Sequence, residues 1–290
     1  MLKAEPIVDA QATLGEGALW DARRRRLLWV DIQAGKVHLF NPDAGEDESI
    51  AVGQTVGTVV PRARGGLIVA MHRAVAAIDP DCREPKILAE LQSPTAENRF
   101  NDGKCDPAGR FWVGTISASR RPDACLYRLQ ADLSIHHVLD GVVNSNGLAW
   151  SLDAKTMYYI DTGTHAIDAF DYDIDSAAVR NRRTVAAVPA DEGKPDGMTI
   201  DAEGMLWVAH WGGGRVNRWD PRSGRLLQTV AVPAAHTTSC AFGGTDLATL
   251  YITTARTGMT AEQLTAQPHA GDLFAVHPGV SGVPAFEFAG

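Results

Sequence analysis

The chain has 290 residues, of which 45% are hydrophobic and 21% charged, with a formal net charge of −8 at pH 7. This acidic balance argues against a nucleic-acid partner, because phosphate binding requires a basic surface. Four cysteines without a CxxC pair, a start unlike a secretory signal and no apolar run of about 18 residues predict a cytoplasmic protein with reduced thiols and no membrane association.

A short apolar strand recurs six times along the chain. The copies are LLWVDI (27–32), GLIVAM (66–71), RFWVGT (110–115), TMYYID (156–161), MLWVAH (205–210) and TLYITT (249–254). Their spacing of roughly 40–50 residues is the period of propeller blades. Each copy follows a second short strand, and turn signals such as DPAG (106–109) separate the strands. We therefore predict an all-β fold, a six-bladed β-propeller with four-stranded blades that occupies residues 1–290 as a single domain.

Blades four and five can be traced strand by strand. The predicted strands are 147–150, 156–161, 166–173 and 181–188 in blade four, and 197–200, 205–210, 215–220 and 226–232 in blade five. Residues 260–267 (TAEQLTAQ) are expected to form a helical turn within blade six. Because a closed ring leaves no unpaired edge, residues 4–10 are expected to pair with the last blade beside the C-terminal PAFEFAG, 284–290.

Four of the strands that precede the recurring copies contain an acidic or amide residue followed by glycine. These pairs are Glu16-Gly17, Asp102-Gly103, Asn146-Gly147 and Asp196-Gly197. Counted back from the start of each copy, Glu16, Asn146 and Asp196 lie 11, 10 and 9 residues upstream. Innermost strands of a propeller enter the central channel from one end, so these side chains are expected to meet at its mouth. The alternative, that each pair is a turn dipeptide, explains one pair more readily than four in matching positions.

The expected cluster suits a metal ion. Two carboxylates and one or two amides make an oxygen-only donor set with a net charge of about −2, which favours hard divalent cations. Three protein ligands leave coordination positions for water and substrate, as in catalytic metal sites. We predict one divalent ion (Ca²⁺, Mn²⁺, Mg²⁺ or Zn²⁺) in a central metal channel.

The sequence resembles the regucalcin (senescence marker protein) and gluconolactonase family from about residue 14 to residue 290. The segments that carry the resemblance are 97–115, 145–162, 169–183, 195–216 and 237–244. The resemblance implies a six-bladed β-propeller that binds one divalent metal in its channel and hydrolyses sugar lactones. It implies three metal ligands: Glu16 from LGEG, Asn146 from SNGL and Asp196 from PDGM.

The resemblance also implies substrate contacts. Arg99 and Asn101, both in the RFND segment, are the implied contacts, and Asn101 rather than Asp102 is implied to face the channel. Family members carry a sugar-contacting glutamate after the GTM segment, whereas this chain has Ser119 near that position, in a shorter loop. Ser119 is therefore the third implied substrate contact, and the sugar preference of a relative is not transferred.

The leading hypothesis is metal-dependent hydrolysis of an aldonolactone to its aldonic acid. The ion is expected to polarise the lactone carbonyl and stabilise the developing oxyanion. Asp196 is the expected general base, and Arg99 and Asn101 are expected to orient the sugar hydroxyls. Two alternatives stay open: a phosphotriesterase-like hydrolase, and a calcium-binding regulatory protein without catalysis. The sequence makes no prediction about self-association.

Overall fold

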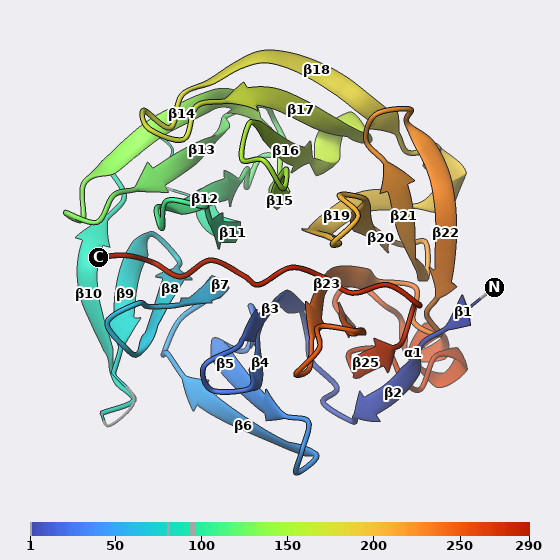
Figure 1. The fold of residues 1–290 in the computed structure, drawn as a ribbon. Helices are drawn as coiled ribbons and strands as arrows, with labels where there is room; N and C mark the ends of the chain where they lie inside the picture. Colours follow the sequence, from blue (N-terminus) through green and yellow to red (C-terminus); the bar gives the residue numbers. More distant parts are fainter. Residues whose placement is uncertain (1, 80–81, 93–94, 96) are drawn as a thin grey trace.

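The computed structural model describes residues 2–79, 82–92, 95 and 97–290, and it contains six β-sheets arranged around one axis (Figure 1). The predicted six-bladed β-propeller is confirmed. The four strands of each blade are antiparallel, and in blades one to five they run from the channel outward in chain order. The six recurring apolar copies form the second strand of each blade, where both faces of the strand are buried by neighbouring blades.

Blades one to three contain the following strands. Blade one has β3 (Gly15–Asp21), β4 (Arg26–Asp31), β5 (Lys36–Asn41) and β6 (Glu46–Ala51). Blade two has β7 (Val56–Pro61), β8 (Leu67–Met71), β9 (Ala74–Ile78) and β10 (Pro85–Glu90). Blade three has β11 (Arg99–Cys105), β12 (Phe111–Ile116), β13 (Ala124–Leu129) and β14 (Ile135–Val142).

Blades four and five agree closely with the strands traced from the sequence, and blade six completes the ring. Blade four has β15 (Ser145–Trp150), β16 (Thr156–Asp161), β17 (Ala166–Tyr172) and β18 (Val179–Ala187). Blade five has β19 (Lys194–Ile200), β20 (Leu206–Trp211), β21 (Arg215–Asp220) and β22 (Arg225–Ala231). Blade six has β23 (Thr237–Gly243), β24 (Thr249–Thr254) and β25 (Leu273–Val276). Short 3-10 turns, η1 (Thr162–Thr164) and η2 (Ala190–Glu192), precede β17 and β19.

The predicted helical turn in blade six is present as α1 (Ala261–Ala266). Thr260 and Gln263 form a capping box at its start: the Thr260 hydroxyl oxygen accepts a hydrogen bond from the Gln263 backbone N–H, and the Gln263 side chain accepts one from the Thr260 backbone N–H. Across the described residues, no helix has the length and apolar character needed to cross a bilayer.

The N-terminal segment closes the ring. β2 (Glu5–Val8) pairs antiparallel with β25 and supplies the fourth strand of blade six, as predicted. β1 (Leu2–Lys3) continues onto the neighbouring blade, where it pairs parallel with β22. The free edges of both blades are thereby covered by the same segment.

The prediction that the C-terminal PAFEFAG lies beside the N-terminal segment is wrong. The tail crosses one face of the propeller instead, as Figure 1 shows, and it ends at blades two and three. Phe288 forms a bridge with Arg62 and is fully buried, and the Ala289 N–H donates to the Gly109 carbonyl oxygen at 2.9 Å. β2 already occupies the edge of β25, so the tail finds its partners and a buried site for Phe288 on the opposite side of the ring.

A buried Asp–Trp–Arg network fixes the turn after the innermost strand of blade five. The Asp201 carboxylate accepts hydrogen bonds from Trp207 Nε1 at 2.9 Å and from Arg218 Nε at 2.7 Å. It also accepts two backbone N–H bonds of the turn, from Glu203 and Met205. Asp106 accepts equivalent bonds from Trp112 and Arg110 in blade three. In blade five the network ties the turn to β20 and β21, and in blade three it ties the turn to β12.

We expect Asp201→Ala to lower the free energy of unfolding by about 3 kcal/mol, because removing one partner of a buried ion pair leaves the other charge uncompensated. Arg218 keeps only its bond to Glu203, which lies at the surface. Guanidinium denaturation measures the change, with the exposed Asp175→Ala as the matched control. A loss no larger than that of the control would contradict the assigned role of the network.

Candidate functional site

A β-bulge or register irregularity lies near the start of the innermost strand in all six blades, and in blades one, three, four and five it lies at an acidic or amide residue. In these four blades the register shifts occur between Glu16 and Leu19, Phe100 and Gly103, Ser145 and Leu148, and Pro195 and Met198. A bulge bends its strand and re-aims one side chain, and bulges are frequent beside active sites. Each of these four bulges contains one of the oxygen-bearing positions that the sequence placed at the channel mouth.

The glycines that follow Asn146 and Asp196 lie inside strands, so the turn-dipeptide alternative does not apply to them. A Cβ atom on Gly147 would stand 2.5 Å from the Met198 Cβ of the next blade. A Cβ atom on Gly197 would stand 2.5 Å from the Ser239 Oγ in blade six. Glycine is required here because the innermost strands of adjacent blades approach each other closely around the channel.

A cavity of about 200 Å³ opens at the end of the channel where the innermost strands begin. Its lining consists of Leu14, Glu16, Arg99, Asn101, Ile116, Asn144, Asn146, Thr162, Lys194, Asp196 and Trp211. The structure thus brings together the three predicted metal ligands and two of the three predicted substrate contacts.

Ser119, the third predicted substrate contact, does not line this cavity. It is exposed in the loop between β12 and β13, and its hydroxyl donates to the Asp123 carboxylate at 2.8 Å. The same hydroxyl lies 3.1 Å from Ser117 Oγ. These bonds hold Ser119 within its own short loop. The sequence showed that the loop is short, but it could not predict where the Ser119 side chain would point.

The residues present fit a divalent cation. Asn146 Oδ1 and Asp196 Oδ1 are buried, and neither atom has a hydrogen-bond partner in the described part of the chain. The other end of the Asn146 amide is fixed, because its Nδ2 donates to Thr162 Oγ1 at 3.0 Å, and Thr162 in turn donates to the Pro195 carbonyl. Burying an oxygen without a hydrogen-bond donor costs free energy, and one cation bound to both oxygens would remove that cost.

The pKa shifts of the charged groups in and beside the cavity also favour a bound cation. Burial, reinforced by the nearby Asp102 carboxylate, raises the pKa of Glu16 to about 8. Burial and then the charges of Glu16 and Asp102 raise the pKa of Asp196 well above its usual range. Burial lowers the pKa of the Arg99 guanidinium, and Glu16 opposes that change. Glu16 and Asp196 line this cavity with Asp102 nearby, and the raised pKa values of Glu16 and Asp196 show that their ionised forms need a compensating positive charge, which a divalent cation supplies.

Arg99 and Asn101 are braced across blades three and four. Asn101 Oδ1 accepts a hydrogen bond from Arg99 Nη1 at 2.9 Å. Asn101 Nδ2 donates to Asn144 Oδ1 at 3.1 Å and to the Ser145 carbonyl oxygen at 2.9 Å. The pair is therefore held in a defined orientation beside Glu16 and Asp196.

The sequence reasoning missed several lining residues that a simple signal could have found. Asn144 and Lys194 lie two positions before Asn146 and Asp196, as Arg99 lies two positions before Asn101. Alternate residues of a strand point to the same face, so these side chains face the same space as the predicted ones. An adjoining cavity of about 330 Å³ shares Asn144, Thr162 and Lys194 and adds residues such as Arg120 and His165.

A second set of possible ligands lies away from the channel. Cys125, His137 and Asp140 place one donor atom each within 4.8 Å of the others, on the outer strands β13 and β14 of blade three. His137 Nε2 lies 2.8 Å from Asp140 Oδ1, so a direct interaction between these two side chains explains their proximity without a metal ion. This rim cluster contains none of the predicted metal ligands.

With the cavity established, comparison with known proteins places the chain in a family. Residues 14–256 match the family described as SMP-30/Gluconolactonase/LRE-like region. Regucalcin of Danio rerio is 46% identical over 293 residues, which cover 100% of this chain and 99% of that protein. The chain belongs to the SMP-30/gluconolactonase family. The family resemblance drawn from the sequence is thereby confirmed.

Two solved structures resemble this SMP-30/gluconolactonase family member along most of its length. A luciferin-regenerating enzyme is 31% identical with a TM-score of 0.92, and the match covers 99% of both chains. A gluconolactonase of Xanthomonas campestris is 26% identical with a TM-score of 0.75, covering 93% of this chain and 87% of that one. The family and these neighbours support a lactonase-type or calcium-binding role.

Proposed function

We propose that this protein is a divalent-metal-dependent lactonase that opens a sugar lactone, an aldonolactone, to its aldonic acid. The observation that carries the proposal is the pair of buried, unpartnered oxygens on Asn146 and Asp196, in the same cavity as Glu16 and the braced Arg99 and Asn101. A purely structural cluster has no need for oxygens left without donors.

Glu16, Asn146 and Asp196 are the residues that hold the ion in this proposal. When bound, a divalent cation supplies Lewis acidity toward the lactone carbonyl and offsets the charge that develops on it. Oxygen-only donors favour Ca²⁺, Mn²⁺ or Mg²⁺ over Zn²⁺.

Asp196 is the proposed general base. One of its carboxylate oxygens is enough for ligation, and the second accepts a proton from the attacking water as the new C–O bond forms. The ring C–O bond then breaks, and the proton passes to the ring oxygen. Arg99 and Asn101 orient the sugar hydroxyls, and Lys194 at the mouth offers an ammonium to the same substrate.

A pH-indicator assay tests the proposal across five- and six-membered aldonolactones, after chelation and again with each divalent ion restored. We expect hydrolysis to stop on chelation and to return with Ca²⁺, Mn²⁺ or Mg²⁺. Zinc titrations are run in the Cys125→Ser variant, which removes the soft ligand of the rim cluster. Hydrolysis that is indifferent to chelation, or faster on phosphotriesters than on every lactone, would overturn the proposal.

Calcium binding without catalysis is the second candidate. The oxygen-only donor set and the high identity to proteins named regucalcin favour it independently of any reaction. The same assay, combined with a thermal melt, separates the two candidates. A binding protein without catalysis has a higher melting temperature with Ca²⁺ but hydrolyses no lactone in the panel.

We expect Lys194→Met to raise KM for the lactone by roughly tenfold with a smaller change in kcat, because a charge-assisted hydrogen bond is lost from substrate binding. Lys194 lines both adjoining cavities and is exposed, so the fold should be unaffected. Steady-state kinetics measure the effect, with the exposed Lys155→Met as the control. An unchanged KM would remove Lys194 from the substrate site.

A further inference from the structure

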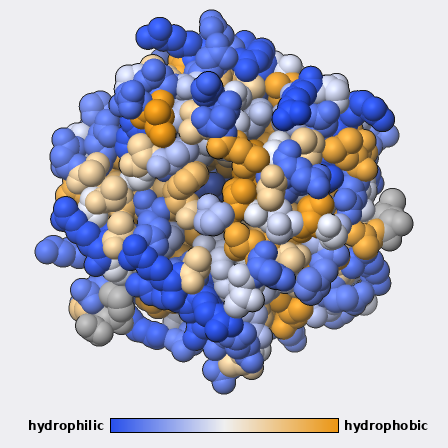
Figure 2. Space-filling model, in the orientation of Figure 1, coloured by the Kyte–Doolittle hydropathy of each residue, from blue (hydrophilic) through white to orange (hydrophobic). Residues whose placement is uncertain are grey.

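A second cavity lies at the opposite end of the channel from the candidate metal site. Its volume is about 430 Å³, and five innermost strands contribute their last residues to it, among them Trp20, Lys104, Trp150, Ile200 and Phe242. The ligand-bearing positions lie at the first residues of the same strands. Figure 2 shows a hollow at the centre of this face, with hydrophobic residues around its rim.

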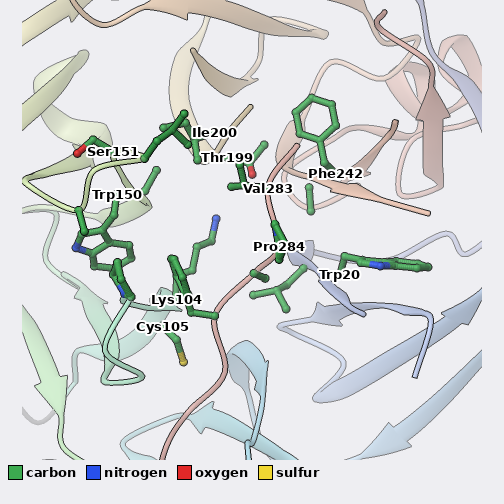
Figure 3. A pocket seen from close by; sticks show the side chains of 18 of the residues that line it. Trp20, Lys104, Cys105, Trp150, Ser151, Thr199, Ile200, Phe242, Val283 and Pro284 are labelled. Carbon is green, nitrogen blue, oxygen red and sulfur yellow. The ribbon is translucent and has the colours of Figure 1, made fainter. Parts of the chain in front are cut away.

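Residues 283–286 of the C-terminal tail, here called the strap, run across this cavity and form part of its wall. The tail is fixed on both sides of the strap: the Gly282 N–H donates to the Leu247 carbonyl oxygen at 2.8 Å, and the Phe288 N–H donates to the Pro61 carbonyl oxygen at 2.9 Å. Figure 3 shows the strap residues Val283 and Pro284 between Trp20 and Trp150. The tail thus turns an open channel end into a bounded pocket.

The lining is apolar with one charge. Four aromatic side chains line the cavity, and Lys104 is the only charged residue among the lining residues of the described chain. Ser151 and Thr199 are the only side-chain hydroxyls in the same lining. A sugar presents a hydroxyl on nearly every carbon and would leave most of them without partners here, so this pocket does not suit the lactone substrate.

Lys104 supplies the feature that selects a ligand. Its ammonium carries three donors, of which the structure assigns one, at 2.7 Å to the Met198 carbonyl oxygen. Asp102 lies two residues earlier on β11, toward the metal end of the channel, so the two charges share a strand face while Lys104 lines the cavity. Burial lowers the pKa of Lys104, and Asp102 opposes that change.

We propose that this cavity is a binding site for a small monocarboxylate with an apolar body, held by the Lys104 ammonium at its head and by the aromatic walls along its length. The volume lies in the range of pockets that enclose small ligands, about 300–1,000 Å³. Leu152 and Phe286, both large and exposed, line the cavity and extend its apolar surface to solvent. The site goes beyond the proposed lactonase activity and shares none of the residues that line the metal cavity.

Isothermal titration calorimetry with decanoate and 1-decanol tests this proposal on the full-length protein without added metal. We expect decanoate to bind with a 1:1 stoichiometry and at least about tenfold more tightly than 1-decanol, a difference of about 1.4 kcal/mol. In Lys104→Met this preference should disappear while 1-decanol binding is kept; Lys155→Met, an exposed lysine beside the lining residue Ala154, should behave like the unaltered protein.

Leu152→Asp provides a variant that leaves Lys104 itself unchanged and should not disturb the core, because Leu152 is 55% exposed. It should weaken decanoate binding more than 1-decanol binding, whereas the matched surface change Leu226→Asp should affect neither. Absence of decanoate binding, equal affinity for acid and alcohol, or full retention of the preference in Lys104→Met would each overturn the proposal. None of these results depends on lactone hydrolysis, so this site and the proposed function can fail separately.

Discussion

Asp196→Asn is expected to lower kcat for lactone hydrolysis by about 10²–10⁴-fold, because the change removes the proposed base together with one charged ligand. Asparagine has nearly the same size and shape as aspartate, so the buried position of Asp196 can accept it and the variant should fold. The measurement is the steady-state rate at saturating Ca²⁺ or Mn²⁺, with the melting temperature recorded in parallel.

Two further variants make this result specific. Asp175→Asn, an exposed aspartate of the blade-four turn, should retain full activity. Thr162→Val should lower activity less than Asp196→Asn, because Thr162 acts by holding the Asn146 amide and the Pro195 carbonyl in place. If Asp196→Asn kept more than a tenth of the rate, Asp196 would have no part in the proton transfer.

The second large effect concerns stability and pH. In the metal-free protein the pKa of Glu16 is about 8, against 4.5 for an exposed glutamate. The folded state therefore holds a proton that the unfolded state has lost between these values, and the free energy of unfolding falls as pH rises through this interval. Asp196 adds to the trend in the same direction. We expect the melting temperature without metal to be lower at pH 8 than at pH 6.

Calcium should reverse this dependence, because a bound cation favours the ionised carboxylates. The increase in melting temperature on adding Ca²⁺ should be larger at pH 8 than at pH 6, and at a concentration of 100 Kd the stabilisation is about 2.7 kcal/mol. Glu16→Gln should flatten the pH dependence and weaken the response to Ca²⁺. A response of equal size at both pH values, or one that survives in Glu16→Gln, would contradict the assigned ligands. Differential scanning calorimetry in matched buffers measures both quantities.

The repeat predicted the fold because each blade uses the same local pattern of apolar strand and turn, which is visible without tertiary information. The meeting of Glu16, Asn146 and Asp196 in one cavity also followed from the repeat, since equivalent positions in a ring face one axis, whereas Asn101 was selected over Asp102 only by the family resemblance. Their role as ligands and substrate contacts stays a proposal. Lys194 and Asn144 were missed because only the residue next to the glycine was considered, although strand alternation points their side chains the same way.

The path of the C-terminal tail could not be predicted in the same manner. Its sequence offers Phe286 and Phe288 at alternate positions, as an edge strand does, but only Phe288 is buried, and it is buried against blade two. Where the tail packs depends on which backbone groups are still unpaired once β2 has taken the edge of β25. The prediction that Ser119 contacts the substrate could not be checked from the sequence for a related reason. The conformation of its loop is set by local hydrogen bonds to Ser117 and Asp123.

The pairing of β2 with β25 also sets the order of events during biosynthesis. Glu5 lies opposite Ala275, so β2 cannot pair until the much later strand β25 has been synthesised and blade six can be completed. Contacts so distant along the chain form slowly, and an unpaired strand edge promotes association between nascent chains. β2 therefore stays unpaired between the synthesis of these two strands, and we expect association between nascent chains to be favoured in that interval.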